Sequence, residues 1–105
     1  MTRDQAPIQR EPRRVRPPYD VRDDRFEHLH ATNTEAWRVA VRIDRLTALC
    51  EPLHGLEVTD YERGVLDWLA GWETSTVAVL AGLLHRARAA GPLAEQGAER
   101  PPVSP

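Results

Sequence analysis

Two closely spaced pairs of side chains could together offer four ligands to a zinc ion. Cys50 and His54 are four residues apart, and His28 and His30 are two apart. Thiolate and imidazole are common zinc ligands, but neither pair matches the spacing of a known zinc site. Pro52 also interrupts the helix that would bring Cys50 and His54 onto one face. The sequence therefore predicts no metal and no cofactor, and it predicts that Cys50 is a small buried residue.

The same groups could act in catalysis. Cys50 beside a histidine could serve as a nucleophile, and Asp60 with His54 could form an acid–base pair. The sequence contains no nucleophile elbow, no glycine-rich phosphate loop and no paired-carboxylate motif. Short helices also leave little room for the concave pocket that a substrate needs. We therefore do not expect an enzyme.

Arginine supplies all of the positive side chains, with 14 Arg and no Lys. Arg38, Arg42 and Arg45 step by four and three, so they share one face of a helix. This face is either solvated, as exposed charged faces usually are, or a docking surface for an acidic partner. Residues 1–19 hold five Arg against two acidic residues. This segment is either a basic arm for nucleic acid or an acidic partner, or a solvated leader.

The three tryptophans are the second group of candidate binding residues. Trp68 and Trp72 are four residues apart and continue an apolar stripe through Tyr61 and Val65, while Trp37 lies on an earlier helix. Large aromatic rings dominate both cores and interface hot spots. Either all three tryptophans pack in the core, or Trp68 and Trp72 bind a protein partner or a second copy in a homodimer.

A helix-turn-helix is the alternative source of function. Residues 62–71, with Leu69-Ala70-Gly71 at the turn, and the following Thr76-Val77-Ala78 resemble the helix-turn-helix of LuxR-type regulators and of sigma factor region 4. The resemblance implies that the helix after the turn reads DNA. The side chains that would face base edges or reach phosphates are then Thr74, Ser75, Thr76, Val79, Arg86 and Arg88.

Three features depart from that pattern. The LuxR-type pattern continues into a further helix, whereas this chain turns Pro-rich after Gly91. Residues 58–74 carry four acidic residues against one Arg, a charge of −3 that repels the phosphate backbone. The first turn of the third helix also lacks the Arg, Lys, Asn or Gln side chains that usually contact bases. Nucleic acid is therefore the less favoured partner.

A second resemblance covers residues 46–91. The Gly71-Trp72 turn, Thr76-Val77 and the run 83–90 are similar to small actinobacterial proteins from phage and integrated elements. This resemblance implies a short helical accessory protein and names no activity.

Three helices must position these side chains. The first, at 33–50, begins with oxygen-bearing caps at Thr32-Asn33-Thr34 and Glu35. The second, at 59–71, begins with a capping box of Thr59 and Glu62 and stops near Gly71. The third, at 75–90, ends at Gly91-Pro92. The predicted inward residues of the first helix are Ala36, Ala40, Ile43, Leu46 and Cys50, and those of the third are Val77, Leu80, Leu84 and Ala87.

The fold class expected from these elements is an all-α, small three-helix bundle, with the second and third helices as a tight hairpin or helix-turn-helix. Eight of nine prolines lie near the ends, which predicts disordered Pro-rich tails at 1–22 and 92–105 around a helical domain at 23–91. The sequence leaves open whether residues 23–31 continue the first helix. With one cysteine, no signal peptide and no long apolar run, we expect a cytoplasmic protein without a membrane partner.

Overall fold

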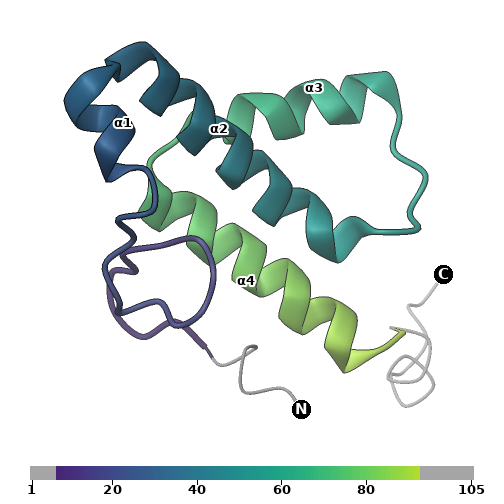
Figure 1. Ribbon diagram of the computed structural model, residues 1–105. Coiled ribbons are helices and arrows are strands. Elements are labelled where there is room, and N and C mark those ends of the chain that lie inside the picture. The colour runs from purple at the N-terminus through teal and green to yellow at the C-terminus, as the bar shows by residue number, and fades with distance from the viewer. Residues whose placement is uncertain (1–6, 93–105) are drawn as a thin grey trace, which may run out of the picture.

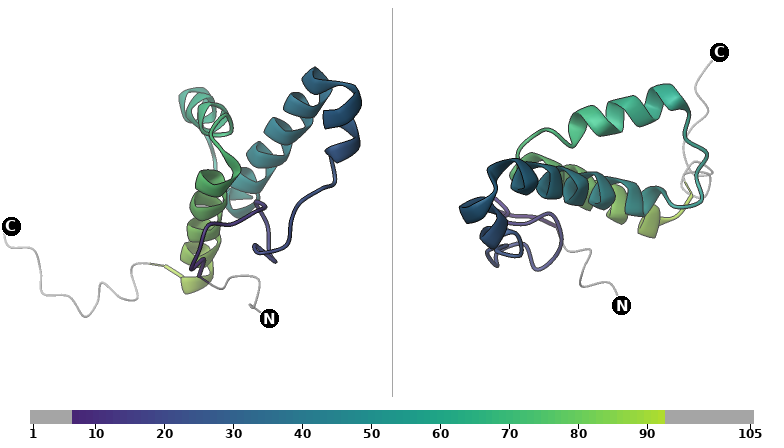
Figure 2. Two further views of the ribbon diagram at one scale, coloured as in Figure 1. Left: turned by 90° about the vertical axis from the view of Figure 1, so that its left-hand side faces the viewer. Right: turned by 45° about the horizontal axis from the view of Figure 1, so that its top comes forward.

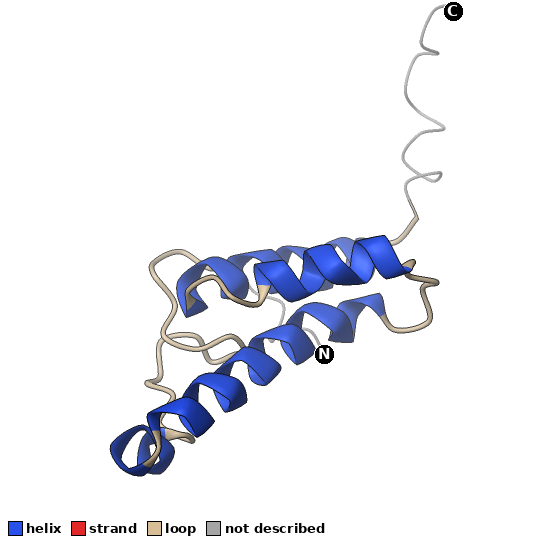
Figure 3. Ribbon diagram, turned by 90° about the horizontal axis from the view of Figure 1, so that it is seen from above, coloured by secondary structure: helices blue, strands red, loops and turns tan. Residues whose placement is uncertain are grey.

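The structure, a computed structural model, describes residues 7–92, which form helices and loops but no strand (Figure 1, Figure 3). The elements in chain order are α1 (Glu27–Thr32), α2 (Thr34–Cys50), the 3₁₀ turn η2 (Glu51–Leu53), α3 (Asp60–Leu69) and α4 (Thr74–Ala90). The predicted all-α class is confirmed. The three predicted helices agree closely with α2, α3 and α4, and α1 is an addition to them.

Residues 27–32 do not continue the first predicted helix but form a helix of their own, α1. Asn33 has an extended backbone (φ −155°, ψ 92°), so the two helices are separate. Its side-chain oxygen accepts a hydrogen bond from the amide of Ala36 at 3.0 Å, which makes Asn33 the cap of α2. The neighbouring Thr32 instead donates to the carbonyl of His28 inside α1.

Helix α3 begins where the sequence predicts. The Thr59 hydroxyl accepts from the amide of Glu62 at 3.1 Å, and the Glu62 carboxylate accepts from the amide of Thr59 at 3.0 Å. This reciprocal pair is the predicted capping box. Upstream, Gly55 has φ +87° and turns the chain between η2 and α3, a conformation that favours glycine.

Helix α2 is the central helix of the fold. It packs against α1, α3, α4 and η2 (Figure 1, Figure 2). The expected tight hairpin of the second and third helices is wrong, because α3 and α4 each pack principally against α2 rather than against each other. The buried core residues are Val15, Ala48, Leu49, Val77 and Ala81, with Leu66, Leu69, Leu80 and Leu84 packed against them. The small side chains in this set allow α2 and α4 to approach closely.

The buried side of α2 differs from the predicted stripe. Ile43 and Cys50 are exposed, whereas Ala48 and Leu49 are buried. Because α2 packs against three other helices, its buried side extends around the helix beyond one stripe. The prediction of a buried Cys50 is therefore wrong. In α4, by contrast, Val77 is buried as predicted.

Part of the expected N-terminal tail belongs to the core. Val15 is 3% exposed and lies within the core cluster, and Pro12 is also buried. The Arg13 amide donates to the Tyr19 carbonyl at 2.7 Å and closes a loop. The prediction of a disordered tail is therefore corrected for residues 7–22, because an apolar side chain inside this proline-rich segment fills the space between α2 and α4. The rest of the two predicted tails, 1–6 and 93–105, lies outside the described residues.

Candidate functional site

Helix α3 has two apolar sides, and the fold uses only one of them. Leu66 and Leu69 pack against the core. The exposed part of its apolar surface carries Tyr61, Val65 and Trp68, and Trp72 follows in the turn after the helix. We call these four residues the α3 aromatic face. Tyr61, Trp68 and Trp72 are 83%, 59% and 45% exposed. The interpretation that all three tryptophans pack in the core is therefore wrong for Trp68 and Trp72.

Contacts with α2 hold the C-terminal end of α3, next to the tryptophan pair. Trp68 and Trp72 form an edge-to-face pair with ring centroids 5.6 Å apart and an interplanar angle of 82°. At the same end of α3, Arg42 of α2 donates to the Asp67 carbonyl at 2.7 Å and pairs with the Asp67 carboxylate at 3.3 Å. A guanidinium on a carbonyl of the last helical turn satisfies a group that the helix leaves unpaired. The pair of rings is thus held in a defined place.

The predicted arginine stripe does not act as one surface. Arg42 binds the end of α3, and the Arg45 guanidinium donates from Nε and Nη2 to the hydroxyl of Thr74 at 3.4 and 3.2 Å. Burial is the main cause that lowers the pKa of Arg45. Arg38 makes no contact of this kind with another helix, and its 67% exposed side chain lies 3.7 Å from the Glu35 carboxylate. Two of the three arginines therefore connect α2 to its neighbours.

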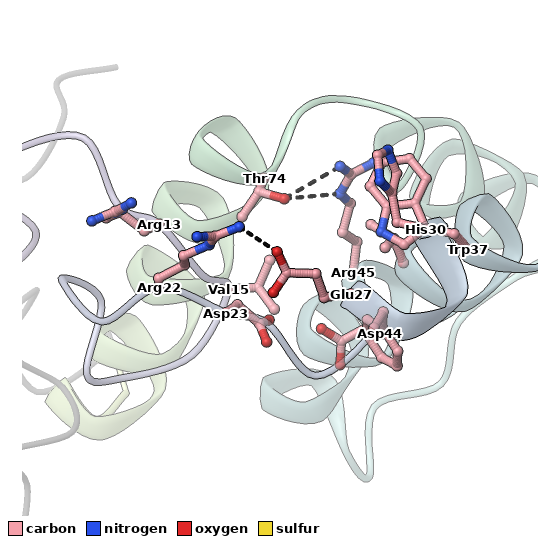
Figure 4. A pocket seen from close by; sticks show the side chains of 12 residues that line it. Arg13, Val15, Arg22, Asp23, Glu27, His30, Trp37, Asp44, Arg45 and Thr74 are labelled. Atoms are coloured by element: carbon pink, nitrogen blue, oxygen red, sulfur yellow. Dashed lines mark hydrogen bonds and ion pairs between the residues drawn. The ribbon is translucent and has the colours of Figure 1, made fainter. Parts of the chain in front are cut away.

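Trp37 lies apart from the other tryptophans. It is half-buried on α2 and packs edge-to-face on His30 of α1, with ring centroids 4.7 Å apart. Both rings line a cavity of about 270 Å³ between the N-terminal segment, α1, α2 and the start of α4 (Figure 4).

The acidic side chains that line this cavity form ion pairs with arginines. Asp44 accepts from Arg16 at 2.7 Å and from Arg25 at 2.6 Å, and Glu27 pairs with Arg22 at 2.6 Å. Asp23 accepts two hydrogen bonds from the Arg25 side chain, which lower the pKa of its carboxyl group. Each of the three carboxylates that line this cavity is thus paired with at least one arginine.

This network of ion pairs was not predicted from the sequence. The available signal was Asp44, which lies in line with Val41 and Ala48 on the buried side of α2. A carboxylate at such a position requires a cationic partner. Arg16, which also pairs with Glu51 at 2.9 Å, is that partner and fastens the N-terminal segment to α2.

Some of the residues that would bind DNA instead make contacts within the chain. The Thr74 hydroxyl accepts a hydrogen bond from the Arg45 guanidinium, and Arg88 donates to the carbonyls of Pro52 and His54 at 2.8 and 2.7 Å. Ser75, Thr76 and Val79 line a groove whose other wall is the N-terminal segment 8–12. Arg86 is half-buried. The face of α4 that would enter a DNA groove thus lies beside residues 8–12 of the same chain.

The described residues offer neither a candidate metal site nor a candidate membrane span. Within residues 7–92, no three His, Cys, Asp or Glu side chains gather in an arrangement that could hold a metal ion. No helix in the same part of the chain is long and apolar enough to cross a bilayer.

Comparison of the chain with protein-family models, curated proteins and solved structures found no significant match.

Proposed function

We propose that this chain is a non-enzymatic helical interaction module that binds a protein through the α3 aromatic face. The observation that carries the proposal is the exposure of Tyr61 and Trp68 on α3 and of Trp72 just after its end, while Leu66 and Leu69 of the same helix pack against the core. Tryptophan and tyrosine are the residues most enriched at the energetic centres of protein interfaces. Single exposed apolar residues are ordinary on a protein surface, whereas a contiguous exposed apolar patch is typical of an interaction site.

The arginines add little to this proposal as a separate surface. Arg42 supports the face from below through Asp67, whereas Arg45 points to Thr74. We therefore assign Arg42 a positioning role and leave Arg38 as a candidate for a rim contact.

The DNA-binding alternative has less support. Its proposed reading residues lie beside the N-terminal segment, and Arg88 is committed to two carbonyls. Binding to DNA depends on the neutralisation of phosphates and falls steeply with salt. We expect no rise in the anisotropy of a labelled duplex when the protein is titrated at low salt. Salt-dependent binding that is lost when Arg86 and Arg88 are both replaced by Ala would favour DNA instead.

A site-specific photo-crosslinker tests the protein-binding proposal. The crosslinker replaces Tyr61 in the full chain, and in a matched control it replaces Leu83, which is 49% exposed on α4. After irradiation in cells of the encoding organism, mass spectrometry should identify a protein adduct at position 61 and not at position 83. The identified protein, which can be the chain itself, should bind the purified chain at least about 30-fold more weakly after Trp72→Ala. Equal labelling at both positions would contradict the proposal.

A further inference from the structure

A glycine lies in the middle of α3 at the edge of the aromatic face. Gly64 is one turn before Trp68 and three residues after Tyr61. A Cβ atom built on Gly64 would meet no atom within 4 Å. Glycine weakens the interior of a helix relative to alanine. The packing of the chain on itself thus gives no reason for this residue, and the space next to Gly64 is open beside the exposed Trp68.

The charged flank next to Gly64 alternates in sign. Asp60, Arg63 and Asp67 are spaced by three and four, so they share one side of α3. The guanidinium of Arg42 ends this row, since its Nη1 lies 3.0 Å from the position of a Cβ on Gly71. All four of these charged residues are exposed. Along the helix the order of charges is therefore negative, positive, negative, positive.

Both patterns match themselves when the helix is reversed. A twofold axis perpendicular to α3 near Val65 lays a second α3 antiparallel on the first and keeps the same flank on the same side. Trp68 of each copy then lies over Gly64 of the other. On the flank, Arg63 faces Asp67 of the other copy, and Asp60 faces Arg42. A parallel arrangement would place like residues level with each other and align the two helix dipoles.

We propose that the partner of the α3 aromatic face is a second copy of this chain, bound by antiparallel packing of α3 on α3, with Trp68 of each copy seated over Gly64 of the other. The inference rests on the proposed function and names its partner. Its support is the open space at Gly64 and the alternating charges of the flank, which no aromatic face requires by itself.

Sedimentation equilibrium of the full chain from about 1 µM to about 1 mM tests the pairing. The wild-type chain should sediment as a reversible dimer in this range. Trp68→Ala should raise the dissociation constant at least about 30-fold, as expected for a central aromatic anchor. Leu83→Ala, on an exposed part of α4, should leave it unchanged.

Gly64→Ala separates the pairing from folding, because its two effects have opposite signs. The added methyl group meets open space in one copy, so the midpoint of urea unfolding, measured at a concentration where the chain is monomeric, should rise. The same methyl group lies under Trp68 of the second copy, so the dissociation constant should increase by about tenfold.

Charge reversals on the flank test the direction of the two helices. The Arg63→Glu substitution places a negative charge opposite Asp67 of the other copy, and Asp67→Arg places a positive charge opposite Arg63. Each variant alone should therefore dimerise more weakly. Mixed together, the two variants restore both opposite-sign pairs, and they should form a heterodimer about fivefold tighter than either homodimer.

A chain that remains monomeric at about 1 mM overturns the inference, as does a dimer unaffected by Trp68→Ala or Gly64→Ala. A mixture with no preference for the heterodimer overturns the antiparallel pairing. If the chain is monomeric but the crosslinker at position 61 labels a different protein, this inference fails while the proposed function stands. If position 61 labels nothing, the proposed function fails as well.

Discussion

The docking of the N-terminal segment through Val15 leads to a measurable change in stability. Val15 is 3% exposed and packs with Ala48, Leu49, Val77 and Ala81. Val15→Ala removes two methyl groups from this cluster. At about 0.8 kcal/mol for each buried carbon, the lost transfer free energy is about 1.6 kcal/mol. The cavity that remains brings the expected loss of unfolding free energy to about 2–3 kcal/mol.

Urea unfolding followed by far-ultraviolet circular dichroism measures this loss, because the described regular structure is helical. For a small protein, the expected loss lowers the urea midpoint by about 1–2 M. Val21→Ala is the matched control, since Val21 lies in the same part of the chain but is 47% exposed. This control should change the unfolding free energy by less than about 0.5 kcal/mol. Equal midpoints for the two variants would refute the docking of residues 7–22.

Three further predictions concern single side chains. Arg88→Gln removes a charged donor from two carbonyls, and we expect urea unfolding to show a loss of about 1–3 kcal/mol. Asp23 has a lowered pKa in the folded chain because Arg25 donates to it, so its contribution to stability is present above the ordinary value of 3.8. That contribution is lost as the pH falls through the lowered pKa, and Asp23→Asn should reduce the dependence of the unfolding free energy on pH below about 4. Exposed Cys50 should react with a thiol reagent in the native chain at the rate of a free thiol.

Each of these predictions has a control in the same chain. Arg86→Gln should cost less than Arg88→Gln, and equal losses would contradict the role of Arg88 in holding the loop after η2. Arg25→Gln removes the donor that lowers the pKa of Asp23, so it should reduce the same dependence on pH. A native-state thiol reaction much slower than in urea would show that Cys50 is covered.

The helix ends of this protein could be predicted from the sequence. The capping box of Thr59 and Glu62 forms as expected, because both partners lie within one turn and need no distant contact. The end of α4 at Gly91 also follows from local signals, since the glycine adopts φ +94° before a proline. For the same reason, the all-α class and the positions of α2, α3 and α4 follow from short-range patterns.

The site could be predicted only in part. The spacing of Tyr61, Val65, Trp68 and Trp72 places them on one side of α3, but it is the same spacing that a core-facing stripe would have. Leu66 and Leu69 supply a second apolar side, and nothing local decides between the two. The arginine stripe was equally ambiguous, because the partners of Arg42 and Arg45 lie 25 and 29 residues away in the chain.

The sequence by itself thus determined where helices begin and end, because those choices depend on hydrogen bonds between residues a few positions apart. Only the tertiary structure decided which sides of the helices are buried. Val15, from a segment with the composition of a tail, packs against α2 and α4, and this added neighbour changes the buried side of α2. Burial depends on contacts between distant segments, whose free energy is shared by several elements and belongs to no single stretch of sequence. The same contacts left the aromatic side of α3 exposed to solvent.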